Sequence, residues 1–167
     1  MKRELRLDII DILEDNSRTT PAEISMMLDV SEDVVKKEIK KLEDEKVIVK
    51  YTAFINRQAL SEEDDHEAEA LIEVQITPQR DYGYDDMAKR IYQYDEVQAV
   101  YLMAGTYDLA VRIKSKSMKE ISKFVFEKLA VIDGVTNTVT VFIMRKYKEQ
   151  GVILVGEESD ERLVVSP

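Results

Sequence analysis

An acidic stretch without periodicity divides this chain and constrains its fold more than any other feature. Residues 57–69, RQALSEEDDHEAE, concentrate carboxylates and follow neither a helical nor a strand period. Such a segment is typical of a solvated connector. At 167 residues the chain is long enough for two small domains. We therefore expect one domain on each side of this stretch.

Helical spacing dominates the part of the chain before the connector. Apolar residues at intervals of three and four predict a first helix over residues 5–16, with Arg6 on its polar face. The sequence TPAE is a capping box with Thr20 as N-cap, and it predicts a second helix over residues 21–28. Ser31 is expected to cap a third helix that ends near residue 45.

A β-rich run follows these helices. Residues 47–55, VIVKYTAFI, are β-branched or aromatic for the most part and predict a strand with a wing-like turn near Lys50. Three helices followed by a β-wing form the pattern of a winged helix-turn-helix.

Beyond the connector the pattern changes to βαββαβ. Strands are predicted at residues 70–76, 97–103, 108–113 and 135–144, and helices at residues 85–94 and 118–131. This is the order of the ferredoxin-like α+β fold, in which both helices cover one face of an antiparallel sheet. The last strand carries apolar residues on both faces, which favours sheet-to-sheet association between subunits.

The tail offers two further short apolar segments, residues 152–155 and 163–165, which are expected to form a hairpin or an edge strand. The predicted organisation is a winged helix-turn-helix domain, an acidic linker, a ferredoxin-like domain and a tail, at residues 1–56, 57–67, 68–147 and 148–167.

The composition excludes several classes of protein. A net charge of -10 argues against nucleic-acid binding by bulk attraction, so any DNA binding must come from a local patch. The absence of cysteine excludes disulfides and thiolate chemistry and is compatible with a reducing cytoplasm. No apolar segment follows Met1 and no run of about 18 apolar residues occurs, so neither secretion nor a membrane partner is expected. We expect a cytoplasmic protein.

The sequence holds no convincing catalytic or metal-binding constellation. The single histidine, His66, lies between Asp65 and Glu67 in the acidic connector, where a solvated charge run is favoured over a divalent-metal site. There is no cysteine nucleophile and no glycine-rich phosphate loop. We therefore expect no enzyme, no catalytic residue, no metal and no cofactor.

Two separate stretches resemble the Lrp/AsnC, or feast/famine, family of transcription regulators. The first comprises ILEDNSR at residues 12–18, EISMMLDVS at 23–31, VKKEIKKLE at 35–43 and KVIVKYTA at 46–53. The second is GTYD at residues 105–108. The sequence departs from the family where Glu38 replaces a usual arginine and Lys46 a usual glycine. The resemblance covers nearly the whole chain.

The third predicted helix carries an exposed basic ridge, composed of Lys36, Lys37, Lys40 and Lys41. Such a ridge suits a DNA-facing helix. Alternatively it is a solvated face held by i, i+4 pairs with Glu32 and Asp33. The resemblance favours DNA binding. Because each subunit offers few positive charges, affinity is expected to depend on two or more subunits binding at once.

The resemblance and the docking of helix-turn-helix proteins assign roles to these residues. The N-terminal part of the recognition helix meets base edges while flanking groups contact phosphates. The expected groove-side residues are Glu32, Asp33, Lys36, Lys37 and Lys40. The expected phosphate contacts are Arg18, Thr20, Lys50 and Tyr51.

The GTYD loop also has two interpretations. It can be a tight turn, with Gly105 at a positive φ and Asp108 accepting local hydrogen bonds. The resemblance instead implies an effector pocket at a subunit interface, in which Asp108 would hold the ammonium of an amino acid. The expected effector-binding residues are Met103, Ala104, Gly105, Thr106, Tyr107, Asp108, Thr136 and Thr138.

Together these features predict a sequence-specific transcription regulator of amino-acid-related metabolism. Its partners would be double-stranded DNA, an amino acid or similar small effector, and copies of itself, as a homodimer that assembles into an octamer by resemblance. One alternative is an architectural DNA-wrapping protein without an effector. Another is a ligand-binding or enzymatic ferredoxin-like protein whose N-terminal helices only mediate contacts.

Overall fold

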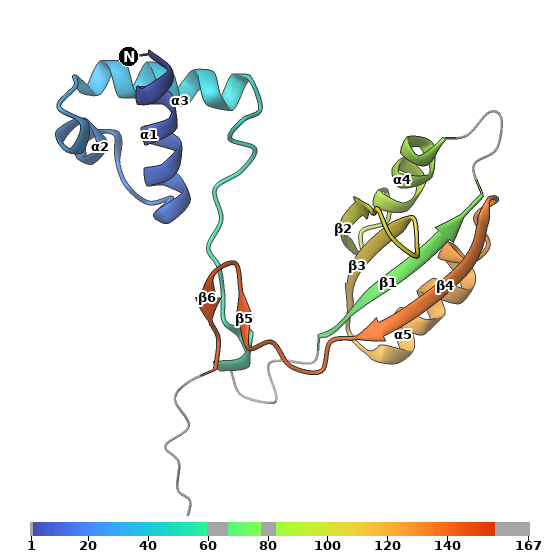
Figure 1. Ribbon diagram of the computed structural model, residues 1–167. Helices are drawn as coiled ribbons and strands as arrows, with labels where there is room; N and C mark the ends of the chain where they lie inside the picture. The colour runs from blue at the N-terminus through green and yellow to red at the C-terminus, as the bar shows by residue number, and fades with distance from the viewer. Residues whose placement is uncertain (1, 60–66, 78–82, 156–167) are drawn as a thin grey trace, which may run out of the picture. The chain divides into compact units, whose positions relative to one another are not determined.

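The computed structural model describes residues 2–59, 67–77 and 83–155 and divides into two compact units, Met1–Ile55 and Asn56–Pro167 (Figure 1). The N-terminal unit contains three helices, α1 (Lys2–Asp15), α2 (Pro21–Leu28) and α3 (Glu32–Asp44). Their buried residues form one small core, composed of Ile9, Leu13, Ile24, Val35 and Leu42. All three predicted helices are confirmed.

The capping box at the start of α2 is also confirmed. Thr20 Oγ1 accepts a hydrogen bond from the backbone N–H of Glu23, and Glu23 Oε2 accepts one from the backbone N–H of Thr20. Ser31 occupies the N-cap position of α3, but its side chain makes no capping hydrogen bond. Its carbonyl oxygen instead accepts from the N–H groups of Val34 and Val35.

The predicted wing strand is wrong. Residues 47–55 contain no strand, and the N–H groups of Val47 and Ile48 both donate to Leu42 O, at 2.9 and 3.0 Å. A strand requires a neighbouring strand for its backbone groups, and the described part of the chain supplies none here. β-propensity therefore identified the segment but not its pairing.

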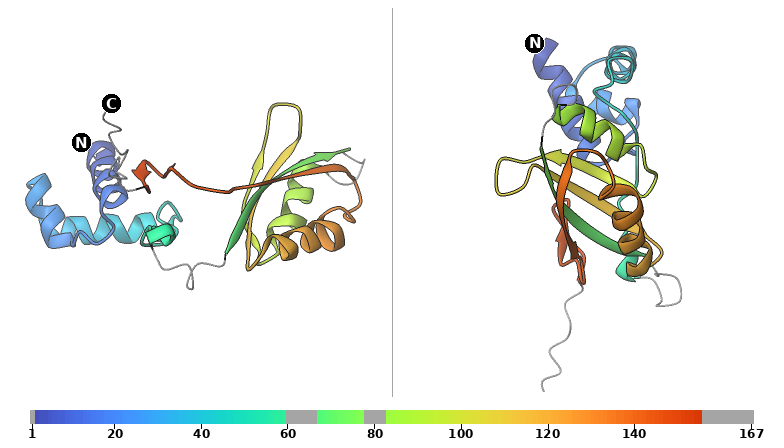
Figure 2. Two further views of the ribbon diagram at one scale, coloured as in Figure 1. Left: turned by 90° about the horizontal axis from the view of Figure 1, so that it is seen from below. Right: turned by 90° about the vertical axis from the view of Figure 1, so that its right-hand side faces the viewer.

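In the C-terminal unit the predicted βαββαβ order is confirmed. The elements are β1 (Ala68–Ile76), α4 (Tyr84–Tyr92), β2 (Val97–Leu102), β3 (Leu109–Ser115), α5 (Met118–Phe124) and β4 (Val135–Phe142). The four strands form one antiparallel sheet in the order β2-β3-β1-β4. Both helices lie on the same face of this sheet (Figures 1 and 2).

The strand register defines two different sheet faces. Ile72 of β1 lies opposite Val111 of β3 and Thr140 of β4, and opposite residues of neighbouring strands share a face. This face packs against the helices and includes the fully buried Ile72 and Val111. The other face carries Val139 and Val141, which are 45% and 49% exposed. We call it the open sheet face.

Two local predictions need correction. The helix at residues 118–131 is α-helical only to Phe124 and continues as a π-helix over Val125–Leu129, closed by a bond from Ala130 N to Val125 O. The tail hairpin pairs β5 (Lys148–Glu149) with β6 (Val152–Ile153), and residues 163–165 lie outside the described residues. Gln150 and Gly151, at φ 48° and 81°, form its two-residue turn, because two left-handed residues suit a tight hairpin.

Candidate functional site

The basic ridge of α3 is exposed, as predicted, but half of it is already paired. Lys36 Nζ lies 2.8 Å from Glu32 Oε1, and this hydrogen bond raises the pKa of Lys36. Lys41 Nζ lies 3.2 Å from Glu38 Oε2. The remaining two lysines of the ridge form no ion pair with any residue that the structure describes. They are the ridge charges most available to DNA.

The predicted phosphate contacts, Arg18, Thr20, Lys50 and Tyr51, are all exposed. The hydroxyl group of Thr20 donates to Glu23 Oε2 at 2.8 Å, and that of Tyr51 to Glu43 Oε1 at 2.9 Å. Burial and then this bond raise the pKa of Tyr51. Within the described structure, the charged groups of Arg18 and Lys50 make no such contact. Those two side chains are therefore the freer phosphate-contact candidates.

An ion-pair cluster between α1 and α3 was not predicted. Arg6 was expected on a solvated face, yet its Nη2 lies 2.5 Å from Glu45 Oε2 and its Nη1 3.7 Å from Glu38 Oε1. The contact with Glu45 raises the pKa of Arg6 and lowers that of Glu45. Glu38 thus has a cationic partner on the neighbouring helix. Helical periodicity alone could not reveal which polar residues meet across two helices.

The loop that contains GTYD is joined to the end of β1. Met103 N donates to Asp108 O at 2.8 Å, which closes the loop on itself. Asp108 N donates to Val74 O at 3.0 Å, and Gln75 Nε2 donates to Thr106 O at 2.9 Å. Sequence reasoning did not single out Gln75, because nothing in a strand pattern marks one polar residue as a loop support.

The two predicted threonines of β4 are placed differently. Thr136 Oγ1 donates to Gln75 O at 3.1 Å, so Thr136 and the loop meet through the same residue of β1. Thr138 lies opposite Val74, on the helix-covered face of the sheet, and is half-buried. The structure therefore brings Thr136, but not Thr138, into the hydrogen-bonded surroundings of the loop.

The Asp108 carboxylate already has two contacts within the unit. Its Oδ2 accepts a hydrogen bond from Ile76 N at 2.8 Å, and its Oδ1 lies 3.4 Å from the donating hydroxyl of Tyr84. Tyr84 begins α4 and was not predicted to take part. Asp108 is half-buried, and carboxylate oxygens have more than one lone pair, so further hydrogen bonds remain possible.

Gly105 does not need its lack of a side chain for the fold of this unit. Its φ is not positive, and a Cβ atom added to it would meet nothing within 4 Å. The alternative interpretation, in which a left-handed turn requires a glycine at this position, is therefore not supported. The other loop residues are exposed from Met103 to Thr106 and half-buried at Tyr107.

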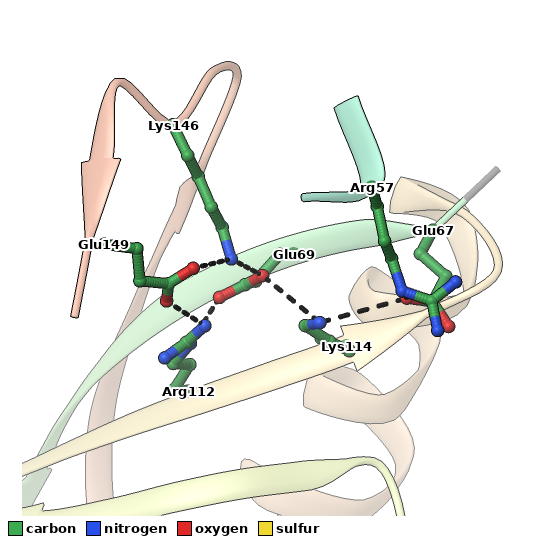
Figure 3. A network of polar contacts seen from close by, with 7 residues as sticks. All are labelled: Arg57, Glu67, Glu69, Arg112, Lys114, Lys146 and Glu149. Carbon is green, nitrogen blue, oxygen red and sulfur yellow. Dashed lines mark hydrogen bonds and ion pairs between the residues drawn. The ribbon is translucent and has the colours of Figure 1, made fainter. Parts of the chain in front are cut away.

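A second charged cluster joins the tail hairpin to the open sheet face (Figure 3). Glu69 of β1, only 7% exposed, is paired with Arg112 and Lys146 and lies 3.9 Å from Lys114 Nζ. Glu149 of β5 pairs with the same arginine and lies 3.0 Å from Lys146 Nζ. All of its cationic members are partnered, so the cluster holds the hairpin to the sheet.

Among the described residues no group of histidine, aspartate and glutamate is arranged to hold a metal ion, and His66 lies outside them. None of the described helices has the length and apolar character needed to cross a membrane.

Comparison with known proteins agrees with this architecture. Residues 2–49 match the family model described as winged helix-turn-helix DNA-binding, and residues 69–153 match the Lrp/AsnC ligand binding domain. The chain is 43% identical over 165 residues to the uncharacterized HTH-type transcriptional regulator YugG of Bacillus subtilis, covering 98% of each protein. It is 30% identical to the HTH-type transcriptional regulator FL11 of Pyrococcus furiosus, covering 84% of this chain and 88% of that one.

A solved structure has the same fold. A transcriptional regulator of Neisseria meningitidis, crystallised as its L-Met complex, superposes with a TM-score of 0.70 and 23% identity, covering 90% of this chain and 95% of that one. The matched relatives are transcriptional regulators rather than enzymes, as the sequence predicts. The chain is a helix-turn-helix transcriptional regulator and belongs to the Lrp/AsnC family.

Proposed function

We propose that this regulator binds double-stranded DNA through α3 and is controlled by an amino acid bound at the GTYD loop. The observation that carries the DNA part is a pair of lysines on the exposed face of α3, Lys37 and Lys40, that form no ion pair with the described residues. α3 is the last helix of a helix-turn-helix whose α2 and α3 pack on one core. Lysine can donate to guanine in the major groove, and Glu32 or Asp33 can accept from cytosine.

Substitution of Lys40 and of Lys50 by alanine distinguishes base contacts from phosphate contacts. Loss of a phosphate contact at Lys50 should weaken binding to all sequences and lower the salt slope by about one. Loss of a base contact at Lys40 should relax the preference for the operator. Fluorescence anisotropy with operator and scrambled duplexes over a salt series measures both. Unchanged binding in both variants would mean that α3 is only a solvated face.

For the effector, the supporting observation is the open space beside Gly105. Because neither φ nor packing requires glycine there, Gly105→Ala should leave stability unchanged. An amino acid that approaches the loop backbone closely would clash with the new Cβ atom. Calorimetric titration with the twenty amino acids, on the parent and on Gly105→Ala, tests this. Equal affinity in both proteins would remove the loop from the binding site.

Asp108 is proposed to hold the ammonium group of the amino acid. Asp108→Asn keeps an oxygen that can accept from Ile76 N but removes the charge. Ligand affinity should therefore fall about ten-fold or more, because a charge-assisted hydrogen bond contributes roughly 1.5–3 kcal/mol. DNA binding without ligand should persist. If the parent binds none of the amino acids while protecting long, sequence-tolerant tracts of DNA, the architectural alternative is favoured.

The protein is proposed to act as a homodimer that assembles further, to an octamer by resemblance. The open sheet face supports self-association, since Tyr101, Val139 and Val141 on it are 45–53% exposed. Burial of such apolar side chains is favourable at roughly 25 cal/mol per Å². Sedimentation of the full chain should show no monomer at micromolar concentration. A Val139→Lys, Val141→Lys double variant should dissociate if this face is the interface.

A further inference from the structure

The Glu38 carboxylate, in the middle of α3, contacts α1 through Arg6 and also pairs with Lys41, one of the ridge lysines. Glu38 Oε1 lies 3.7 Å from Arg6 Nη1, while its Oε2 lies 3.2 Å from Lys41 Nζ. The Glu38 side chain is only 18% exposed, although that of Lys41 is 62% exposed. The acid is therefore fixed beneath the exposed lysine rather than free in solvent.

Arg6 is what keeps this acid in place. Its guanidinium contacts Glu38 and also Glu45 at the C-terminal end of α3, with Nη2 2.5 Å from Glu45 Oε2. One side chain of α1 thus holds two points of α3, and the Arg6 side chain is 29% exposed. The Arg6 and Glu38 side chains are 29% and 18% exposed, and partly buried pairs are screened less by salt than exposed ones, so the contact between them should persist in physiological buffer.

Glu32, which pairs with another lysine of the ridge, is held much less firmly. Glu32 pairs with Lys36, but the two side chains are 45% and 56% exposed and belong to adjacent turns of the same helix. Exposed i, i+4 pairs separate easily, since they stabilise a helix only weakly. A phosphate can therefore displace Glu32 from Lys36. If a phosphate draws Lys41 away, Glu38 stays in place, because its other oxygen faces Arg6, and its negative charge remains beside the ridge.

We propose that Glu38 is an affinity-limiting residue: anchored by Arg6, it neutralises Lys41 and places a fixed negative charge beside the DNA-facing side of α3. This inference rests on the proposed DNA-binding function. Among the described residues, each α3 then presents Lys37 and Lys40 as uncompensated ridge charges. A single subunit binds DNA weakly, and stable occupancy requires several subunits on one DNA, because linked sites multiply their affinities. DNA occupancy consequently responds steeply to assembly.

The direct test is Glu38→Gln in the full chain, with matched operator duplex and a salt series. The amide keeps the size of the side chain and removes the charge. Affinity should rise about three-fold for each engaged subunit and about ten-fold for a dimer at low salt, and the gain should shrink at high salt. Stability of the N-terminal unit should fall at the same time, because Arg6 loses an ionic partner. A gain in affinity together with a loss of stability is not expected of a merely structural residue.

Two variants control for the change in net charge and for a loosening of α3. Glu127→Gln makes the same change in net charge and breaks a longer and more exposed lysine pair, with Lys123 at 3.9 Å, in the other unit; its DNA affinity should equal that of the parent. Glu38→Asp keeps the charge but shortens the side chain, so affinity should stay near the parent value while stability falls. If Glu38→Asp raises affinity as much as Glu38→Gln does, loosening of α3 is the cause and the proposal is wrong.

A comparison of two lysines avoids any change at Glu38, should Glu38→Gln fail to fold. Lys41→Met should change DNA affinity little, because Lys41 is already neutralised, whereas Lys40→Met should reduce it clearly. Equal losses at both positions overturn the proposal. Complete absence of DNA binding by the parent would instead contradict the proposed function, and the two failures are therefore distinguishable.

Discussion

Helix α3 and the sheet of the C-terminal unit both pair acids with lysine or arginine, but the pairs differ in their access to water. On α3 the Glu32 and Lys36 side chains are 45% and 56% exposed. In the C-terminal unit Glu69 is 7% exposed and Arg112 28%. Exposed pairs contribute little to stability and separate readily, whereas removal of one partner from a buried pair leaves an uncompensated charge. The same type of ion pair is therefore easily separated on α3, as the proposed DNA contact requires, and structural in the C-terminal unit.

The largest loss of stability is expected when a buried ion pair of the C-terminal unit is broken. Glu69→Gln leaves Arg112, Lys114 and Lys146 around a neutral side chain, so we expect the C-terminal unit to lose about 2–3 kcal/mol, somewhat less than for a completely buried pair. Denaturant unfolding by circular dichroism measures the loss, and hydrogen exchange of β1 peptides assigns it to this unit.

Glu67→Gln is the matched control for that substitution. Glu67 belongs to the same cluster but is 44% exposed and contacts its partners, Arg57 and Lys114, at 3.5 and 3.9 Å. Its loss should cost less than about 0.5 kcal/mol. Similar costs for the two glutamates would show that exposure does not separate the two classes of pair.

In the N-terminal unit, hydrogen bonds at helix ends should matter more for stability than the ridge charges do. Thr20→Ala removes the side-chain acceptor for Glu23 N at the start of α2. We expect a loss of about 1 kcal/mol, as for other N-cap threonines. Thr20→Ser keeps the oxygen and should restore most of it. The same denaturation experiment, with hydrogen exchange followed in α2, tests both. A fully stable Thr20→Ala variant would contradict the capping role.

Backbone conformation at the end of α3 should have a smaller and opposite effect. Lys46 has φ 59°, a left-handed conformation in which glycine carries no Cβ penalty. Lys46→Gly should therefore stabilise the unit by about 0.5–1 kcal/mol, offset in part by the greater freedom of glycine in the unfolded chain. Lys46→Ala keeps the Cβ atom and should give no gain. A gain in the alanine variant would instead implicate the lysine charge.

How far the sequence could predict this molecule follows from the range of each interaction. Local signals, such as the Thr20 capping box and the spacing of the βαββαβ elements, depend on residues a few positions apart and were read correctly. Contacts between residues of separate elements could not be predicted in this way; Arg6 meets Glu38, and Gln75 meets Thr106, across such elements. The wing strand failed for the same reason, because a strand is defined by a neighbour that β-propensity does not reveal.

An ion pair of intermediate exposure provides the smallest and most discriminating test of the comparison. Lys128 Nζ lies 2.6 Å from Glu96 Oε1, with the two side chains 41% and 32% exposed. The hydrogen bond from Lys128 lowers the pKa of Glu96. A carboxyl group whose pKa is lower in the folded state stabilises the fold above its unfolded pKa, about 4.3, and this stabilisation is lost as pH falls through the folded pKa. The C-terminal unit should therefore lose stability as pH falls below about 5, and Glu96→Gln should flatten that part of the profile.

The control for this pH profile is Glu120→Gln, in the same unit. Glu120 accepts a hydrogen bond from the Ser115 hydroxyl at 2.7 Å but has no cationic partner among the described ion pairs. Its replacement removes the same charge without breaking a described ion pair, and it therefore reports the effect of the charge alone. The effect at Glu96 should be smaller than that of Glu69→Gln, because solvent screens a pair that is about one-third exposed. If Glu96→Gln shifts stability as much as Glu69→Gln does, then partial exposure does not weaken ion pairs in this protein, and the contrast between its two charged regions must have another cause.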